Sequence, residues 1–275
     1  MSDAIRVGLV GFGYASKTFH APLIGGTPGM ALKAVASSDA DKVHADWPGV
    51  KVMSAPGDLL DDPDIDLVVI ATPNDTHFPL AKAALEAGKH VVVDKPFTVT
   101  LSQARELESL AKHCGRILSV FHNRRWDSDF LTVSALINEG QLGEVCYFES
   151  HFDRFRPQVR QRWREQAGPG SGIWYDLAPH LLDQVVVLFG LPVSITVDLA
   201  QLRPGAQSTD YFHAVLAYPQ RRVVLHGTLL AAAESACFIV HGSRASYIKY
   251  GLDPQEERLK NGERLPQEDW GYDMR

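Results

Sequence analysis

The chain has 275 residues, of which 45% are hydrophobic and 22% charged, a composition typical of a globular protein with one large or two medium domains. A formal net charge of −6 argues against nucleic acid or an anionic membrane surface as the main partner. Three scattered cysteines, no signal-like N-terminus and no long apolar run favour a reducing compartment, so we expect a cytoplasmic protein.

The first 122 residues alternate between strand-like and helix-like segments. Strands are expected over residues 5–13, 31–39, 64–73, 90–96 and 116–123, with helices over residues 79–89 and 100–115. Strands that alternate with helices of this length predict βαβ units. We therefore expect a doubly wound parallel α/β sheet over residues 1–122.

The pattern changes past residue 123. Helices are expected over residues 127–140 and near 176–189, and a strand over residues 143–152. From residue 193 onward, strand-like runs are joined by short connections such as residues 218–222, which predicts an antiparallel sheet. On this change of pattern alone, we place a second, α+β domain at residues 123–275.

A glycine-rich turn follows the first expected strand. In a dinucleotide-binding fold, such a turn brings the backbone close to the pyrophosphate at a helix N-terminus. We expect this contact from Gly11, Gly13, Tyr14 and Ala15, although Ser16 stands where the fingerprint has a third Gly or Ala. A plain glycine turn is the alternative, and the place of the turn in a βαβ series favours nucleotide binding.

The end of the second strand indicates which nucleotide is bound. An NAD site places a carboxylate there for the ribose 2′-hydroxyl. If the strand ends at Ala36, that position holds Ser37, and Ser37 and Ser38 can hold a 2′-phosphate, with Lys42 near. This favours NADP over NAD. A slip of two residues would put Asp39 on the ribose and reverse the choice.

Further polar residues follow the next two strands. Thr72, Asn74 and His77 lie at the end of the strand near residue 70, and Lys95 with Pro96 ends the valine-rich strand after it. Ligands of doubly wound sheets lie at these carboxyl ends, so we expect all five residues at the cofactor, with Lys95 near the nicotinamide. The alternative for Thr72 and Asn74 is a proline turn with a helix cap. Pro96 restricts Lys95 to extended conformations.

Three polar residues of the second domain share one helical face. Asp176, His180 and Asp183 are spaced i, i+4 and i+7, and Pro179 is tolerable if it lies in the first helical turn. One alternative makes Asp176 an N-cap and His180 a surface histidine. Another makes the three residues ligands of a metal ion, but no further His or Cys cluster supports it, and we expect no metal.

Two arginine-bearing stretches are further candidates. The segment after residue 121 places Asn123 or Arg125 near the site, and we assign Asn123 to the substrate. A later loop carries five arginines around Trp163: Arg154, Arg156, Arg160, Arg162 and Arg164. A solvated loop is one interpretation of this run. A lid that contacts the cofactor or a polyhydroxy substrate is the other.

Taken together, the motifs resemble a known family. The glycine turn with "TPNDTH" (72–77), "EAGKHVVVDKP" (86–96) and "DLAPHLLD" (176–183) is similar to the glucose–fructose oxidoreductase / inositol dehydrogenase / MocA family, in particular its bacterial NADP-dependent scyllo-inositol dehydrogenase-like branch. The resemblance implies a Rossmann domain, then an α+β domain with an open, mainly antiparallel sheet that forms a homodimer or homotetramer. Members usually continue past the point where this sequence stops, so we expect a C-terminally shortened chain.

The resemblance also implies a role for each site residue. The usual Glu-Lys-Pro is Asp94-Lys95-Pro96 here, and the Asp-x3-His pair maps onto Asp176 and His180, with Asp183 as a substrate contact. We expect hydride transfer between nicotinamide and a secondary alcohol of a cyclic polyol or sugar such as an inositol. A non-catalytic NADP-sensing regulator and a carbonyl or imine reductase are the alternatives.

Overall fold

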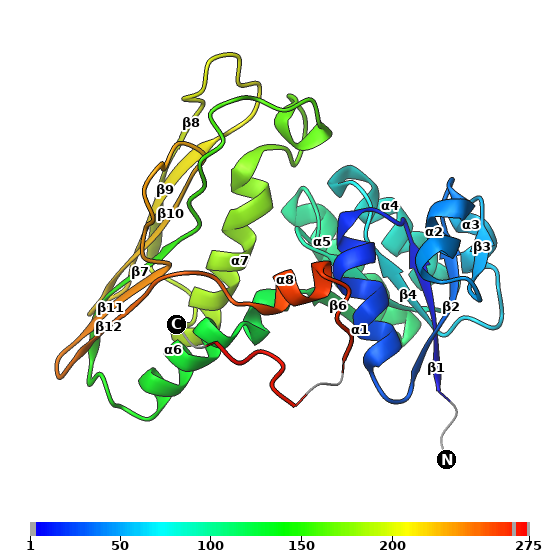
Figure 1. Ribbon diagram of the computed structural model, residues 1–275, viewed down its shortest axis with the longest axis horizontal. Helices are drawn as coiled ribbons and strands as arrows, with labels where there is room; N and C mark the ends of the chain where they lie inside the picture. Colours follow the sequence, from blue (N-terminus) through cyan, green and yellow to red (C-terminus); the bar gives the residue numbers. More distant parts are fainter. Residues whose placement is uncertain (1–3, 266–267, 274–275) are drawn as a thin grey trace. The chain divides into compact units, whose positions relative to one another are not determined.

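The computed structural model describes residues 4–265 and 268–273 (Figure 1). By internal contacts the chain divides into two compact units. The first comprises Met1–Phe121 and Gln255–Trp270, and the second comprises His122–Pro254 and Gly271–Arg275.

The first unit is built on a six-stranded parallel sheet with the strand order β3-β2-β1-β4-β5-β6. Its strands are β1 (Ile5–Val10), β2 (Met30–Ala36), β3 (Lys51–Met53), β4 (Leu67–Ile70), β5 (His90–Asp94) and β6 (Leu118–Phe121). The order reverses between β1 and β4, which is the switch point of a doubly wound sheet. The predicted Rossmann architecture is therefore confirmed, and β3 is a strand that the sequence pattern did not indicate.

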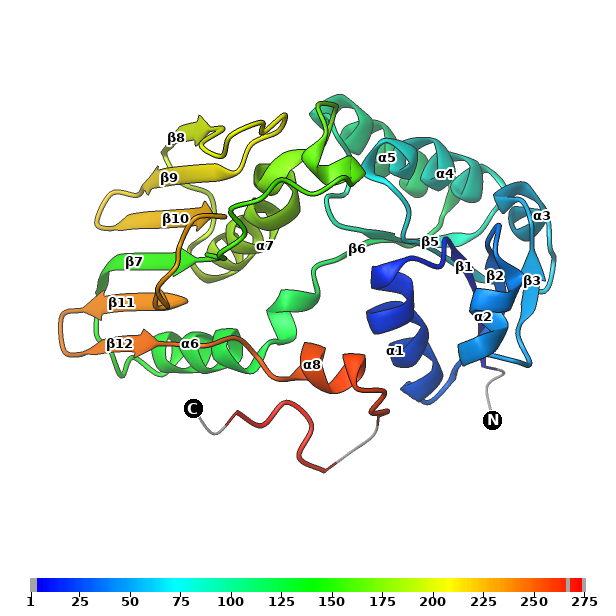
Figure 2. The same cartoon turned by 45° about the horizontal axis from the view of Figure 1, so that its top comes forward.

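Helices cover both faces of this sheet. They are η1 (Ser16–His20), α1 (Ala21–Gly26), α2 (Ala40–Asp46), α3 (Pro56–Leu60), α4 (Asn74–Glu86) and α5 (Leu101–Cys114). A further helix of this unit, α8 (Gln255–Lys260), packs against η1. One core contains Ile70, Leu85 and Leu107, under α4 and α5, and the other contains Leu9 and Ile24, under α1. Figure 2 shows α4 and α5 on one side of the sheet and α1 on the other. Alternating side chains of each strand thus enter two separate cores.

The second unit is built on a six-stranded mixed sheet with the order β12-β11-β7-β10-β9-β8. Its strands are β7 (Val145–His151), β8 (Ser194–Ala200), β9 (Tyr211–Ala217), β10 (Arg222–Thr228), β11 (Phe238–Gly242) and β12 (Ser246–Lys249). Only β7 and β10 pair in parallel among these strands. The prediction of a mainly antiparallel sheet is confirmed.

Helices of the second unit pack on one face of its sheet (Figure 2). They are η2 (Asn123–Trp126), α6 (Ser128–Asn138), η3 (Trp163–Glu165) and α7 (Gly172–Phe189). The core between sheet and helices contains Phe148, Phe212, Leu216 and Leu181, all nearly inaccessible to water. In the part of the chain that the structure describes, no helix of this unit covers the opposite face of the sheet.

Helix α7 begins earlier than the sequence pattern predicts. It starts at Gly172 with Ser171 as N-cap, and the N–H of Ile173 donates to the carbonyl of Thr209 at 2.8 Å, which fixes the first turn. Pro179 therefore lies inside the helix and not in its first turn, the position in which the sequence analysis considered a proline tolerable. The alternative in which Asp176 caps the helix is also excluded.

Gly227 on β10 gives a test of the packing in the second unit. A Cβ at this position would overlap the ring of Phe212, which is fully buried and packs edge-on against Trp174 at 5.4 Å. We expect Gly227→Ala to lower the free energy of unfolding by about 1–3 kcal/mol because a filled core resists an added methyl group. Gly168→Ala, where a Cβ meets open space, is the matched control. Equal urea midpoints for the two variants would contradict the packing described.

Candidate active site

The glycine-rich turn after β1 requires glycine at its first position. Gly11 has a φ of +87°, and a Cβ there would lie 2.9 Å from the carbonyl oxygen of Ala71. Its N–H donates to the carbonyl of Ala36 at 2.9 Å. A Cβ at Gly13 would meet nothing within 4 Å, so the outer side of the turn is open. This is the backbone geometry through which a phosphate group can approach a Rossmann turn.

The unusual third position of the fingerprint has a structural explanation. The Ser16 hydroxyl donates to the carbonyl of Gly11 at 2.8 Å, and the side chain is completely buried. The serine therefore closes the turn from inside with a hydrogen bond that Gly or Ala could not make. The departure at Ser16 leaves the turn intact.

Helix α8 returns to the glycine turn from the far end of the sequence. The phenol of Tyr14 donates to Glu256 Oε1 at 2.6 Å, and Lys260 Nζ lies 6.0 Å from the centre of the Tyr14 ring. Partial burial, together with the Glu256 carboxylate, raises the pKa of Tyr14. The side chain of Tyr14 is thus held by α8, and Ala15 follows it at the start of η1.

The end of β2 lies at the residue that was assumed when the sequence analysis favoured NADP. The strand ends at Ala36, so Ser37 is the first residue beyond it. Asp39 acts as the N-cap of α2, because its Oδ1 accepts the N–H of Lys42 at 3.0 Å. The Ser37 hydroxyl accepts the N–H of Asp39 at 3.1 Å, and Ser38 is exposed. The carboxylate of Asp39 is engaged by a helix and does not stand at the strand end.

The residues after β4 form a braced turn. Asn74 is the first residue of α4, and Pro73 caps the helix without a side-chain hydrogen bond, so neither Thr72 nor Asn74 is the expected cap. His77 is buried, with Nδ1 2.8 Å from the carbonyl of Pro96 and Nε2 3.0 Å from that of Thr72. His77 therefore ties the turn after β4 to the turn after β5.

The turn after β5 is organised by a carboxylate. Asp94 Oδ1 accepts the N–H of Lys95 at 2.7 Å, and Asp94 Oδ2 lies 3.3 Å from Nε2 of the buried His20. Burial alone would raise the pKa of Asp94, but His20 and Lys95 outweigh it and lower the pKa. Asp94 therefore stays ionised beside the strand, and the half-buried Lys95 leaves the sheet at its carboxyl edge, followed by the cis Lys95–Pro96 bond.

These residues occupy one edge of the first sheet. They follow strands that are neighbours in the order β2, β1, β4 and β5: Ser37, Gly11, Thr72 and Lys95. The carboxyl ends of parallel strands are where ligands of doubly wound proteins bind. The edge therefore presents hydroxyls, a turn open to phosphate, and one cation.

The second unit carries its candidate residues on α7. Asp176 and His180 lie one turn apart, and His180 is 6% exposed. Asp176 Oδ1 lies 3.5 Å from Nε of Arg164, so the carboxylate faces the arginine-rich loop. A carboxylate one turn before a histidine on the same helical face is suited to orienting the imidazole.

Asp183 is engaged by an arginine of the same unit. Its two carboxylate oxygens accept from Arg125 at 2.6 and 2.7 Å, and His122 Nε2 lies 3.7 Å away. The side chain of Gln184 donates to the carbonyl of Arg124, which fixes η2 against α7, and Asn123 lies half-buried at the start of η2. Any substrate contact of Asp183 is therefore shared with Arg125.

The described residues form neither a metal-binding cluster nor a membrane-spanning helix. Among them, no group of three or more His, Cys, Asp or Glu side chains is arranged to hold a metal ion. No helix of residues 4–265 and 268–273 is both long and apolar enough to cross a membrane. The arrangement that the structure does offer is a nucleotide edge in one unit and a carboxylate–histidine helix in the other.

The fold and these residues define a nicotinamide-dependent oxidoreductase. Residues 5–122 match the oxidoreductase family domain described as an NAD-binding Rossmann fold, and residues 134–275 match the C-terminal alpha/beta domain of the same family. The chain belongs to the glucose–fructose oxidoreductase / inositol dehydrogenase / MocA family, as its motifs indicated.

Relatives support the same assignment. The oxidoreductase YdgJ of Escherichia coli K12 is 82% identical over 275 residues, which are 100% of this chain and 80% of that protein. The scyllo-inositol 2-dehydrogenase (NADP(+)) IolW of Bacillus subtilis is 38% identical over 99% of this chain and 76% of its own length. An oxidoreductase structure from Yersinia pestis has a TM-score of 0.95 and 71% identity, covering 100% of this chain and 78% of that one.

Sequence reasoning missed three contributors to the site. His20 supports Asp94, and Glu256 and Lys260 reach Tyr14, yet none of them lies within a recognisable motif. His20 had one usable signal, since it is a histidine in the helical segment directly after the glycine turn. The α8 residues had no such signal, because Glu256 and Tyr14 are 242 residues apart in the sequence and so leave no local pattern.

Proposed function

We propose that this oxidoreductase uses NADP and transfers a hydride between nicotinamide and a secondary alcohol or ketone of a cyclic polyol or sugar. The observation that carries the proposal is the placement of Lys95 at the ligand edge of the Rossmann sheet, where its backbone N–H is held by Asp94, which His20 supports in turn. A half-buried lysine directly after a valine-rich strand needs a functional reason, because partial burial of a charge is unfavourable.

In the proposed mechanism, Lys95 and His180 act on the same carbinol. His180 takes the hydroxyl proton as general base, and Asp176 orients the imidazole and stabilises the imidazolium that forms. Lys95 donates a hydrogen bond to the substrate oxygen and stabilises its alkoxide character. The bound nicotinamide supplies the hydride acceptor at C4. In the reverse direction, Lys95 polarises the carbonyl and His180 returns the proton.

The environment of the strand end supports NADP over NAD. Ser37 stands directly after β2, where NAD sites place a carboxylate, and Asp39 is occupied as a helix cap. Without that carboxylate, the hydroxyls of Ser37 and Ser38 can donate hydrogen bonds to a 2′-phosphate, and Lys42 lies in the first turn of α2 beside them. The Ser37 hydroxyl donates to the carbonyl of Asp39 at 3.2 Å and would turn to the phosphate instead. The name of the relative IolW also specifies NADP(+).

The polyol substrate is proposed from one relative and from the retained chemistry. IolW is named for scyllo-inositol, and the Asp176, His180 and Lys95 set is what oxidation of a ring carbinol requires. A non-catalytic NADP sensor is the second candidate, but a sensor has no use for a proton relay. Oxidation of the reduced cofactor in the presence of an inosose or ketose would show an enzyme and exclude the sensor. A carbonyl or imine reductase would instead oxidise the reduced cofactor with non-sugar carbonyl compounds or with imines.

We further propose a homodimer or homotetramer formed through the uncovered face of the second sheet. Across this face, strand register aligns a row with four apolar residues among six: Ile248, Ile239, Glu149, Val224, Val215 and Thr196. Ile248 is 50% exposed, which is unfavourable for a side chain that meets only water. We expect Ile248→Glu to shift the sedimentation coefficient toward the monomer, whereas Leu191→Glu, at an exposed loop, should not. An unchanged distribution for Ile248→Glu would exclude this face.

The first test of the mechanism replaces the lysine. Lys95→Met should lower kcat by about a hundredfold to a thousandfold, as expected for loss of one donor to a developing oxyanion. Binding of NADP, measured by fluorescence titration, should change far less. Lys82→Met, which removes an exposed ion pair with Glu106, is the matched control. Near-normal turnover of Lys95→Met would remove the lysine from the mechanism, and selective loss of NADP binding would give it a purely cofactor role.

The second test addresses the cofactor. Ser37→Asp places a carboxylate directly after β2, where it repels a 2′-phosphate and can accept from a ribose hydroxyl. We expect the preference for NADP over NAD, measured as the ratio of kcat/KM values, to fall at least roughly tenfold. Ser54→Asp, on the segment after β3, is the control for an added charge nearby. If the ratio is unchanged, Ser37 does not face the ribose.

A further inference from the structure

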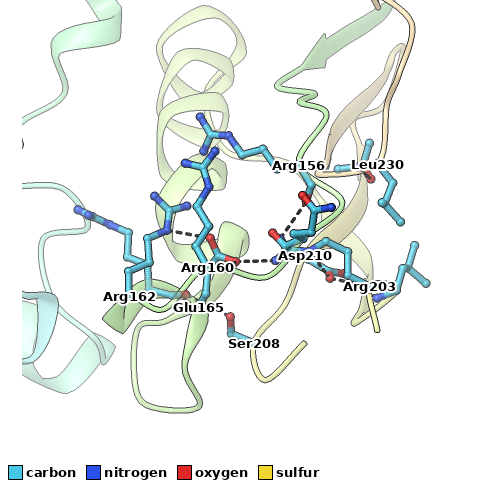
Figure 3. A network of polar contacts seen from close by, with 12 residues as sticks. Arg156, Arg160, Arg162, Glu165, Arg203, Ser208, Asp210 and Leu230 are labelled. Atoms are coloured by element: carbon cyan, nitrogen blue, oxygen red, sulfur yellow. Dashed lines mark hydrogen bonds and ion pairs between the residues drawn. The ribbon is translucent and has the colours of Figure 1, made fainter. Parts of the chain in front are cut away.

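The arginine-rich loop between β7 and α7 is held by a buried ion-pair network (Figure 3). The side chain of Arg203 is 1% exposed and pairs with Glu165 and Asp210, each at 3.0 Å. The same guanidinium donates to the carbonyls of Arg156 and Gln158 at 3.0 and 3.1 Å. One buried arginine therefore fixes both side chains and backbone of the loop.

Other contacts fix the remainder of the loop. Glu165 Oε2 also accepts the N–H of Arg160 at 2.9 Å, and Ser208 donates to the carbonyl of Arg164 at 3.1 Å. Phe155 forms a β-bridge with Leu230. The interpretation of this run as a freely solvated loop does not fit a segment whose backbone is held at so many points.

The fixed loop brings like charges together. The pKa of Arg156 is lowered by burial first and then by the positive charges of Arg160 and Arg162, while Asp176 and Glu165 act against the shift. Figure 3 shows the side chains of Arg156 and Arg160 extending toward the same region above the network. In the described residues, no hydrogen-bond acceptor is paired with the guanidinium of Arg156 or of Arg160.

The arginine-rich loop and its surroundings carry an excess of positive charge, whereas the whole chain is negatively charged. Five arginines meet three carboxylates in this cluster: Arg156, Arg160, Arg162, Arg164 and Arg203 against Glu165, Asp210 and Asp176. The chain as a whole has a net charge of −6. Repulsion among fixed cations is unfavourable unless an anion relieves it, and unpaired guanidinium groups match carboxylate and phosphate oxygens in planar, two-bond geometry.

We propose that Arg156 and Arg160 bind an anionic group of the substrate, a carboxylate or a phosphate ester. The inference rests on the proposed function and narrows it, from neutral polyols to acidic or phosphorylated ones. Its location supports the substrate as the source, since Arg164 of the same loop lies 3.5 Å from Asp176, one helical turn before His180. An anion held by this loop sits beside the residues that handle the proton.

The binding test uses inorganic phosphate and gluconate as probes, and glucose as the neutral counterpart of gluconate. In calorimetric titration of the full chain at low salt, we expect phosphate and gluconate to bind and glucose to bind far more weakly. Arg156→Gln and Arg160→Gln should each weaken anion binding about tenfold, the loss typical of one charge-assisted contact. Arg221→Gln is the control, because that guanidinium packs over the ring of Phe189 at 4.5 Å, outside the cluster.

The outcomes separate the possibilities. Equal anion affinity for the wild type and both glutamine variants, or no anion binding to the wild type, would overturn the proposal. Arg160 is exposed, so Arg160→Gln remains informative if Arg156→Gln fails to fold. If Arg156→Gln and Arg160→Gln weaken the binding of NADP and leave the binding of gluconate unchanged, the loop binds a cofactor phosphate, which also overturns the proposal. Calorimetry needs no turnover, so a failure of the hydride-transfer proposal would appear instead in the Lys95→Met kinetics.

Discussion

The Asp94 carboxylate organises the nucleotide unit at the point where its chemistry is concentrated. A parallel strand buried between two cores cannot hold a lysine, because no partner or water is available inside. The strand ends at Asp94, which captures the Lys95 N–H and is kept ionised by His20. The lysine is thereby delivered to the sheet edge with its backbone fixed.

A second constraint links neighbouring turns of the same edge. His77 bridges the carbonyls of Thr72 and Pro96, so the segments after β4 and β5 are fixed to each other without any ligand. The Gly11 turn is closed in the same way by Ser16. Such internal hydrogen bonds hold binding groups in place before the cofactor arrives, which lowers the entropic cost of binding. Among the residues that the sequence suggested for cofactor binding, His77 therefore has a supporting role, because it holds two neighbouring turns together.

The sequence predicted the elements whose periodicity is local. Buried valine-rich strands, the α5 helix between Thr100 and Gly115, and the antiparallel runs after residue 193 each carry a pattern within about ten residues. The three-residue β3 is too short to show one, and α8 contacts the first unit through residues such as Tyr14 that lie far away in the sequence. The start of α7 was misplaced because Gly172 and Pro179 are poor helix formers whose cost is offset by tertiary contacts. The candidate site residues rest on motifs and stay predictions, whereas supporting residues such as His20 lie outside any motif and were not predicted.

The arginine loop shows how a charged segment can be rigid in an acidic protein. Surface arginines usually gain little from single ion pairs, since both partners stay hydrated and mobile. Here Arg203 is buried with two carboxylates, and removing the guanidinium would leave both without the cation they share, so the network resists opening. The held backbone keeps the attachment points of Arg156 and Arg160 close together, so their positive charges stay near each other. An anion bound between these charges would relieve part of their repulsion, which favours its binding.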